Sequence, residues 1–153
     1  MLRVVLVYPQ IPPNTGNIAR TCAATQTELH LIRPLGFEIS DRYLKRAGLD
    51  YWPYVNLHYH DSWEEFRLVQ QQQGGRCLGF STRGKYSYTS FQFQTGDWLL
   101  FGSETAGLPV GVLESCDATL YIPIAQPGVR SLNLSVSAAV GLFEAQRQLG
   151  YLQ

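Results

Sequence analysis

Glu104 lies inside a glycine-bracketed loop, and its setting suggests chemistry. The loop, Gly102-Ser-Glu-Thr-Ala-Gly107, directly follows the apolar run Trp98-Leu-Leu-Phe101. Such a run has the length and composition of one buried strand. Glycine allows close approach to the backbone because it has no Cβ, and α/β folds bind ligands beyond the carboxyl ends of their strands. The stretch therefore predicts either a ligand-binding loop or an ordinary connection between a strand and a helix.

Two other segments carry polar side chains that could join Glu104. Asn14 and Arg20 follow a proline-rich turn near the N-terminus, and on a helix Asn17 and Arg20 would share a face. An isolated arginine on a helix is most often a solvated charge or part of a surface ion pair. Ser131 and Asn133 stand at the expected start of the last helix, where N-capping is the structural alternative to a functional role.

His58 and His60 place two imidazoles on one face of an expected strand, which could suggest a metal site. The sequence offers no cysteine or carboxylate cluster to complete the ligand set, and Asp61 should point the opposite way. We therefore expect surface or structural histidines and no metal.

Composition favours one folded domain over residues 1–153. Hydrophobic residues make up 45% and charged residues 16%, which argues against disorder. No apolar run approaches the roughly 18 residues of a membrane span, and the N-terminus does not resemble a signal peptide. We expect a cytoplasmic protein with reduced, mostly buried cysteines, because Cys22, Cys77 and Cys116 are odd in number and widely spaced.

The net charge is zero, with 12 basic and 12 acidic residues. Bulk electrostatic capture of nucleic acid is therefore not expected, and any RNA binding needs a local basic face. The dinucleotide-binding fingerprint and the P-loop are both absent.

Strand and helix patterns alternate along the chain, which predicts an α/β fold with a mostly parallel sheet flanked by helices. Strands are expected at 2–8, 29–32, 55–59, 77–81, 98–101 and 119–122, and a loop with some strand character at 83–94. The first helix is expected from an Asn14 or Thr15 cap to about residue 24, and short helices over 41–47 and 110–115. A further helix is expected to start at Ser62, and the last helix to run from a Ser131 cap to about residue 149.

The last helix carries an apolar stripe at helical spacing, formed by Leu132, Val136, Ala139, Val140 and Phe143. It also carries many small residues, namely Ser135, Ser137, Ala138, Ala139 and Gly141. Small residues let another helix approach closely, and that helix could belong to the same chain or to a partner.

Three segments, 10–22, 97–109 and 122–139, resemble in order the three motifs of the SPOUT-class RNA methyltransferases of SpoU/TrmH type. The likeness runs almost end to end, includes Arg46-Ala-Gly-Leu-Asp-Tyr51, and is strongest to small enzymes that methylate the wobble ribose of tRNA. It implies an α/β-knot fold with a C-terminal trefoil knot. It further implies S-adenosylmethionine as methyl donor, no metal, the tRNA anticodon stem-loop as partner, and a homodimer formed through the first and last helices.

The resemblance also assigns residues. Cofactor contacts would be Phe80, Gly102, Ile122 and Ser131, with plain strand core as the alternative for Phe80 and Ile122. The catalytic set would be Asn14, Arg20, Glu104, Ser131 and Asn133. Arg20 would orient the ribose and its phosphate or, less readily, abstract the proton; Glu104 would align Arg20 or anchor its own loop.

The chain departs from the family at Gln126-Pro-Gly-Val129, which lengthens a loop, and at Phe143, where relatives often have tyrosine. RNA contacts are expected among basic residues and two aromatic ones, namely Arg42, Lys45, Arg46, Arg83, Lys85, Arg130, Tyr86 and Tyr88. Two other functions stay open: ribose methylation at another tRNA or ribosomal RNA site, and a flavodoxin-like module that binds a small ligand without catalysis.

Overall fold

The computed structural model describes residues 1–38, 40, 42, 46 and 50–152. Its sheet has the strand order β3-β2-β1-β6-β4-β7-β5, and each pair of neighbouring strands is parallel. The strands are β1 (Arg3–Val7), β2 (Glu28–Ile32), β3 (Leu57–His60), β4 (Cys77–Phe80), β5 (Tyr86–Ser87), β6 (Trp98–Phe101) and β7 (Ala118–Tyr121). The predicted α/β class with a largely parallel sheet is confirmed, and the trefoil knot stays a prediction.

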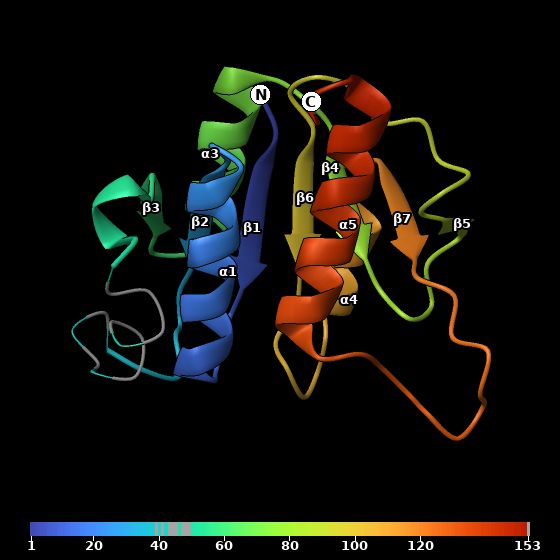
Figure 1. The fold of residues 1–153 in the computed structure, drawn as a ribbon, viewed down its shortest axis with the longest axis horizontal. Coiled ribbons are helices and arrows are strands. Elements are labelled where there is room, and N and C mark those ends of the chain that lie inside the picture. Colours follow the sequence, from blue (N-terminus) through green and yellow to red (C-terminus); the bar gives the residue numbers. More distant parts are fainter. Residues whose placement is uncertain (39, 41, 43–45, 47–49, 153) are drawn as a thin grey trace.

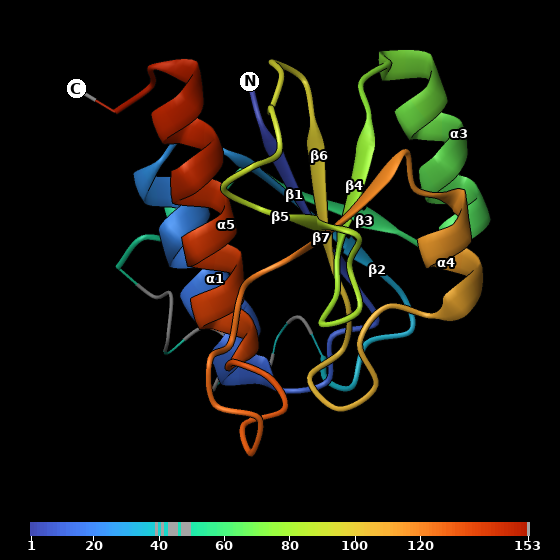
Figure 2. The same ribbon diagram turned by 90° about the vertical axis from the view of Figure 1, so that its right-hand side faces the viewer.

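Helices cover both faces of the sheet, with α1 (Pro12–Ala24) and α5 (Leu134–Leu149) side by side on one face and α3 (Trp63–Gln73) and α4 (Val110–Ser115) on the other (Figure 2). The short 3-10 helix η1 (Trp52–Tyr54) precedes β3, so this strand begins two residues later than predicted. The helix predicted over 41–47 falls outside the described residues, apart from Arg42 and Arg46.

The strands are apolar on both faces, as a parallel sheet covered by two helical layers requires. On β6, Leu99 and Phe101 belong to the core beneath α1 and α5, whereas Trp98 and Leu100 belong to the core beneath α3 and α4. Cys22 and Cys77 are buried, Cys116 is half-buried, and all three are free thiols, as predicted.

All strands run in the same direction, so their carboxyl ends lie along one edge of the sheet. The loops that follow β1, β4, β6 and β7 meet at this edge, together with the N-terminal ends of α1 and α5 (Figures 1 and 2). β1 lies between β2 and β6. From β1 the strands β2 and β3 follow on one side of the sheet, and all later strands lie on the other side, so the direction of the strand order reverses at β1. Open α/β sheets bind ligands beside such a switch point.

Both helices at this edge start differently from prediction. Helix α1 begins at Pro12 with Ile11 as its N-cap, and no side chain of the cap closes it. Proline suits the first helical position because its missing N–H would have no partner there. Helix α5 begins at Leu134 and is capped by Asn133, whose side chain accepts from the backbone N–H groups of Ser135 and Val136. Ser131 precedes this cap.

Small residues of α5 face the protein interior. A Cβ on Gly141 would lie 2.8 Å from ring carbons of Phe80, whose ring stacks on Phe101 at a centroid distance of 4.7 Å. Ala138 and Ala145 are buried beside them. Much of the small-residue content of α5 is therefore explained by packing within the chain.

Three residues of the apolar stripe on α5 face outward, and the sequence left open whether the same chain or a partner packs against this helix. Val136 is 48% exposed, Phe143 is 42% exposed, and Leu132, just before the helix, is 37% exposed. Helix amphipathicity identifies an apolar stripe but not which surface covers it. In the described chain these three side chains are largely uncovered, whereas Ala139 and Val140 of the same stripe are half-buried.

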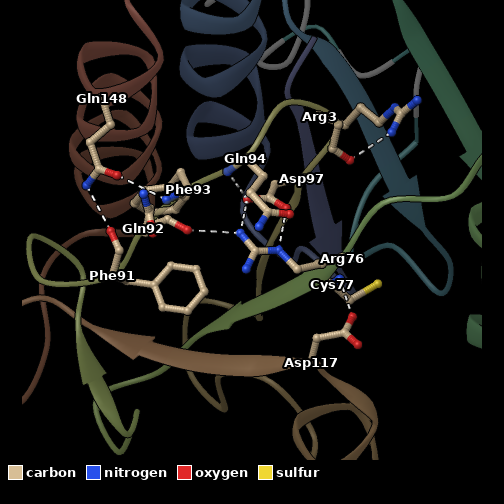
Figure 3. Close-up of polar contacts among 11 residues, drawn as sticks. Arg3, Arg76, Cys77, Phe91, Gln92, Phe93, Gln94, Asp97, Asp117 and Gln148 are labelled. Atoms are coloured by element: carbon tan, nitrogen blue, oxygen red, sulfur yellow. Dashed lines mark hydrogen bonds and ion pairs between the residues drawn. The ribbon is translucent and has the colours of Figure 1, made fainter.

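A buried ion pair closes the opposite edge of the sheet, at the amino ends of β4 and β6 (Figure 3). Arg76 donates through Nε and Nη2 to the two carboxylate oxygens of Asp97, at 2.9 and 2.7 Å. Asp97 is 1% exposed and also accepts from the backbone N–H of Gln94 at 2.7 Å. The Asp97 carboxylate raises the pKa of Arg76 further through these hydrogen bonds.

Candidate active site

A cavity of about 570 Å³ opens at the carboxyl edge of the sheet. Its walls are the loops that follow β4, β6 and β7 and the start of α5. This volume falls within the range of small-molecule sites. All four residues predicted to contact a cofactor line it, namely Phe80, Gly102, Ile122 and Ser131.

The loop after β6 forms one wall and folds back on itself. A Cβ on Gly102 would overlap the backbone of Gly107, which itself has φ of +69°. The N–H of Gly107 donates to the carbonyl oxygen of Ser103 at 3.0 Å, and the N–H of Ala106 donates to Ser103 Oγ at 3.1 Å. Both glycines are thus required by the loop's own geometry.

Phe80 and Ile122 both pack against the core and both line the cavity, and their contact with a cofactor stays a prediction. Phe80 is 7% exposed and packs in the core, while its remaining surface reaches the cavity. Ile122 is half-buried just after β7, and Ser131 is exposed at the mouth.

The cavity wall is chemically mixed. Hydroxyl groups come from Ser81, Thr82, Ser103, Thr105, Ser131 and Ser137. Apolar surface comes from Phe80, Leu108, Leu113, Ile122, Ile124 and Leu134. Two cations, Arg83 and Arg130, and one carboxylate, Glu104, complete the wall. Such a lining suits a ligand with both an apolar ring and polar ends.

Glu104 anchors the segment that leads into α1. Its Oε1 accepts from the N–H of Gln10 and its Oε2 from the N–H of Ile11, both at 2.8 Å, and Oε2 also accepts from Asn14 Nδ2 at 3.3 Å. Free N–H groups at a helix start attract a carboxylate, and the helix dipole adds to that attraction. Glu104 contacts this segment and Asn14 and does not contact Arg20, and its part in the reaction stays a prediction.

Asn133 joins the same hydrogen-bonded group from the other side. Its Nδ2 donates to Asn14 Oδ1 at 3.2 Å, while its Oδ1 accepts from the N–H of Ser135 at 2.8 Å. A continuous chain, Glu104–Asn14–Asn133, therefore links the three predicted motif segments and ties the starts of α1 and α5 to the cavity loop.

Arg20 lies apart from this group. It is an exposed residue of α1, six positions beyond Asn14 and hence about 9 Å further along the helix axis. Arg20 is not among the residues that line the cavity. Its Nη2 donates to the hydroxyl of Tyr51 at 3.1 Å, and its Cζ lies 4.4 Å from the centroid of that ring.

Sequence reasoning gave Tyr51 no role of its own. The available signal was its place at the end of the stretch 46–51, which already belonged to the family resemblance. Hydrophobic periodicity carries no information on such a contact, because residues 20 and 51 belong to separate elements.

The three histidines cluster with one carboxylate, Glu28, which the sequence reasoning did not bring to this place; His30 and His60 are buried and His58 is half-buried. His30 Nδ1 lies 2.8 Å from His60 Nε2, and His30 Nε2 lies 2.9 Å from Glu28 Oε1. Burial lowers the pKa of His30 to about 4 and also lowers the pKa of His60. With neutral rings, His60 donates to His30 and His30 donates to Glu28, so every one of these contacts is satisfied.

Glu28, His30 and His58 offer three ligand atoms within 4.8 Å of one another. The neutral bonding above accounts for the close contacts, and Arg3 Nε, 3.8 Å from Glu28 Oε1, supplies a counter-charge. His58 Nε2, by contrast, has no hydrogen-bond partner among the described residues. The absence of a metal from the mechanism stays a prediction.

The predicted RNA contacts are mostly exposed. Arg83, Lys85, Arg130 and Tyr86 lie at the surface, whereas Tyr88 is half-buried against the core and has less surface free for stacking than predicted. Arg42 and Arg46 are exposed, and Lys45 lies outside the described residues. Among the described helices, none has the length and apolar character needed to cross a membrane.

Comparison with known proteins agrees with this arrangement. Residues 1–143 match the model of the SpoU rRNA Methylase family. A protein of Synechocystis sp. is 62% identical over 149 residues, which are 97% of each chain. A Burkholderia ambifaria protein named tRNA (cytidine(34)-2'-O)-methyltransferase is 47% identical over 153 residues, or 99% of this chain and 97% of that one.

Solved structures give the same result. A protein studied for the 2-OH methylation of C/U34 on tRNA superposes with a TM-score of 0.94 at 53% identity, over 98% of this chain and 97% of that one. The SpoU methyltransferase AviRb from Streptomyces viridochromogenes, solved in complex with the cofactor AdoMet, superposes with a TM-score of 0.87 at 28% identity. That match covers 97% of this chain and 60% of AviRb. With the family model spanning nearly the whole chain and relatives matching it from end to end, the chain belongs to the SpoU rRNA methylase family.

Proposed function

We propose that this protein transfers a methyl group from S-adenosylmethionine to the ribose 2'-hydroxyl of the wobble nucleotide, cytidine or a modified uridine, in the tRNA anticodon stem-loop. The observation that carries the proposal is the cavity at the carboxyl edge of the sheet, whose rim is tied to α1 and α5 by the Glu104–Asn14–Asn133 chain. Support for the substrate comes from the Burkholderia relative and from the structure studied for methylation of C/U34.

The residues of the cavity fit S-adenosylmethionine. Apolar side chains such as Leu108 and Ile122 can take an adenine ring, and hydroxyl and backbone groups can take the ribose and the amino-acid end. The glycine-bracketed loop brings its backbone directly to the wall, where a purine edge can be hydrogen-bonded. When bound, the cofactor supplies a methyl group on a positively charged sulfonium.

The chain's own task is to position and polarise a poor nucleophile. A ribose hydroxyl reacts faster when it is held in line with the methyl group and when charge on its oxygen is stabilised. Arginine stays protonated in proteins, so we assign Arg20 to orient the ribose and its phosphate and to stabilise the developing oxyanion. Ser131 lines the cavity just before α5, where its hydroxyl can hold the substrate. Asn133 does not line the cavity; it caps α5 and is bonded to Asn14.

We further propose that two copies pair through α1 and α5. The stripe formed by Leu132, Val136 and Phe143 is exposed on the described chain, and burying such surface on a second copy is favourable. Arg20 lies off the cavity of its own chain, which also favours a site completed by a partner. The proposed substrate places the protein in the cytoplasm.

The test is methyl transfer from labelled S-adenosylmethionine to bulk tRNA that lacks this modification, followed by nuclease digestion and nucleoside mass analysis. A 2'-O-methylated cytidine or uridine at the first anticodon position is the expected product. Label at another position would move the site, and label only on ribosomal RNA would change the substrate. Cofactor binding without transfer to any RNA would favour a non-catalytic module.

A further inference from the structure

Tyr51 holds Arg20 in two ways. The guanidinium lies against the aromatic ring, with Cζ 4.4 Å from the centroid, and its Nη2 donates to the ring hydroxyl at 3.1 Å. A cation within about 6 Å of a ring centroid is attracted by the negative face of the ring. Stacking alone would let the guanidinium rotate on the face of the ring. The hydrogen bond from Arg20 Nη2 to the Tyr51 hydroxyl fixes its orientation there.

The contact leaves the charge of Arg20 uncompensated. Among the described residues, no carboxylate lies within ion-pair distance of Arg20. Other arginines of the described chain do have such partners, for example Arg33 with Asp61 and Arg76 with Asp97. A guanidinium has five N–H donors, and Tyr51 takes one of them. The remaining donors form a fork suited to a phosphate or a ribose oxygen.

We propose that Tyr51 is a positioning residue for the reaction, which holds the Arg20 guanidinium flat so that its free N–H groups meet the ribose-phosphate of the RNA substrate. The proposal rests on the proposed function. A flexible arginine loses side-chain entropy when it binds, and a guanidinium already held by Tyr51 loses less of it. Tyr51 therefore acts through the orientation of Arg20 and not through the cofactor cavity, to which it does not contribute a lining residue.

Tyr54 provides a matched control because it lies three residues away on η1 and is 75% exposed, compared with 38% for Tyr51. The ring and hydroxyl contacts of Arg20 are made by Tyr51 and not by Tyr54. If this surface simply stacks RNA bases, loss of the more open Tyr54 ring should be at least as harmful as loss of Tyr51.

The kinetic test is a double-mutant cycle on the full-length protein with tRNA. Tyr51→Leu should lower kcat about tenfold with an unchanged KM for S-adenosylmethionine. Tyr51→Phe keeps the ring face but loses the hydroxyl bond, so it should show a smaller loss of about threefold. Arg20→Lys keeps the charge but loses the planar stack, so adding Tyr51→Leu to it should cost nothing further. Tyr54→Leu should leave kcat unchanged. Additive losses, or equal losses for Tyr51→Leu and Tyr54→Leu, would overturn the proposal.

A spectroscopic test needs no activity. The Nε–Hε signal of Arg20, assigned by its loss in Arg20→Lys, should be shifted upfield by the ring current of Tyr51, keep that shift in Tyr51→Phe and lose it in Tyr51→Leu. An unchanged signal in Tyr51→Leu means that the contact does not exist in solution, which overturns the proposal even in an active enzyme. Wild-type protein that methylates no RNA overturns the proposed function and this role together.

Discussion

At the scale of single residues, the site depends on side chains that join segments far apart in the chain. Glu104 shows this most clearly, because one carboxylate holds two backbone N–H groups and the side chain of Asn14. Its position within a loop could be predicted from the sequence. Its partners could not, because they lie on a different loop and two of them are backbone groups that have no sequence signature.

Replacing Glu104 by glutamine should weaken both the fold and the reaction. One of the two bonded N–H groups would then face an NH₂ donor. Because Gln10 and Ile11 are exposed, the loss of that bond should cost about 0.5–1.5 kcal/mol of unfolding free energy and not the larger penalty of a buried donor. Urea unfolding and initial rates would measure both effects. Glu114→Gln, at an exposed position of α4, is the matched control and should stay within about 0.5 kcal/mol of wild type. Equal stability of the two variants would contradict the anchoring role.

His30 should make stability depend on pH. Burial lowers its pKa from 6.5 to about 4 in the folded protein, so between these values the unfolded chain binds a proton that the folded chain does not. The contribution of neutral His30 to the free energy of unfolding is therefore fully present above pH 6.5 and is lost as the pH falls. By pH 4 the loss amounts to at most roughly 3 kcal/mol. The charges that act on His30 come from Glu28, His58 and His60, and those that act on His60 include Asp61 and Glu65.

Urea unfolding at pH 7, 6 and 5 would test this slope in a range where most carboxylates stay ionised. His30→Gln, which removes the titrating group, should give a flatter profile from a lower starting stability. A wild-type unfolding free energy that does not change from pH 7 to pH 5 would show that His30 charges freely in the folded state.

At the scale of elements, helix α5 connects core packing to the cavity. Gly141 lets the Phe80 ring lie directly against the helix, and the same ring lines the cavity. The helix itself and its apolar stripe could be predicted from periodicity. Its buried face could not, because Ala138, Gly141 and Ala145 are too small to stand out in a hydrophobic pattern, while the larger Val136 and Phe143 face outward.

Gly141→Ala should lower both stability and cofactor affinity. The new Cβ would lie 2.8 Å from the Phe80 ring, and relieving that overlap costs about 1–3 kcal/mol, more than the helix propensity gained. Gly111→Ala in α4 is the control, since a Cβ there meets nothing within 4 Å, and it should be neutral or stabilising. Thermal unfolding and calorimetric titration with S-adenosylmethionine would measure both. Unchanged affinity for S-adenosylmethionine in Gly141→Ala would show that the position of the Phe80 ring does not matter for cofactor binding.

At the scale of the whole molecule, the position of Arg20 leads to a prediction about pairs of chains. A mixed dimer of an Arg20→Ala chain and a Ser131→Trp chain, whose cavity is filled, should keep about half of wild-type activity if each arginine serves its partner's cavity. Co-expression with two different tags allows the mixed dimer to be isolated, and each variant alone should be inactive. An inactive mixed dimer would place Arg20 in its own chain's site, and a monomer in solution would remove the pairing altogether.

The layered architecture could be read from the sequence because a parallel sheet with two covering layers needs continuous apolar strands, such as 98–101, alternating with amphipathic helices. The polar clusters at both ends of the sheet could not be predicted from the sequence in the same way. The Arg76–Asp97 pair (Figure 3) joins residues at a sequence separation that no local pattern records. The same is true of the Glu104–Asn14–Asn133 chain.

Because Glu104 holds the start of α1, the backbone N–H groups of Gln10 and Ile11 should respond to changes in the cavity loop. The N–H groups of Gln10 and Ile11 exchange with solvent hydrogen only when they leave the carboxylate, which is 94 and 93 positions away in the chain. Any ligand that stiffens the cavity wall should therefore slow hydrogen exchange at residues that it does not touch. Conversely, a loop opened to release product should free the start of α1, so turnover and the motion of that helix become thermodynamically linked.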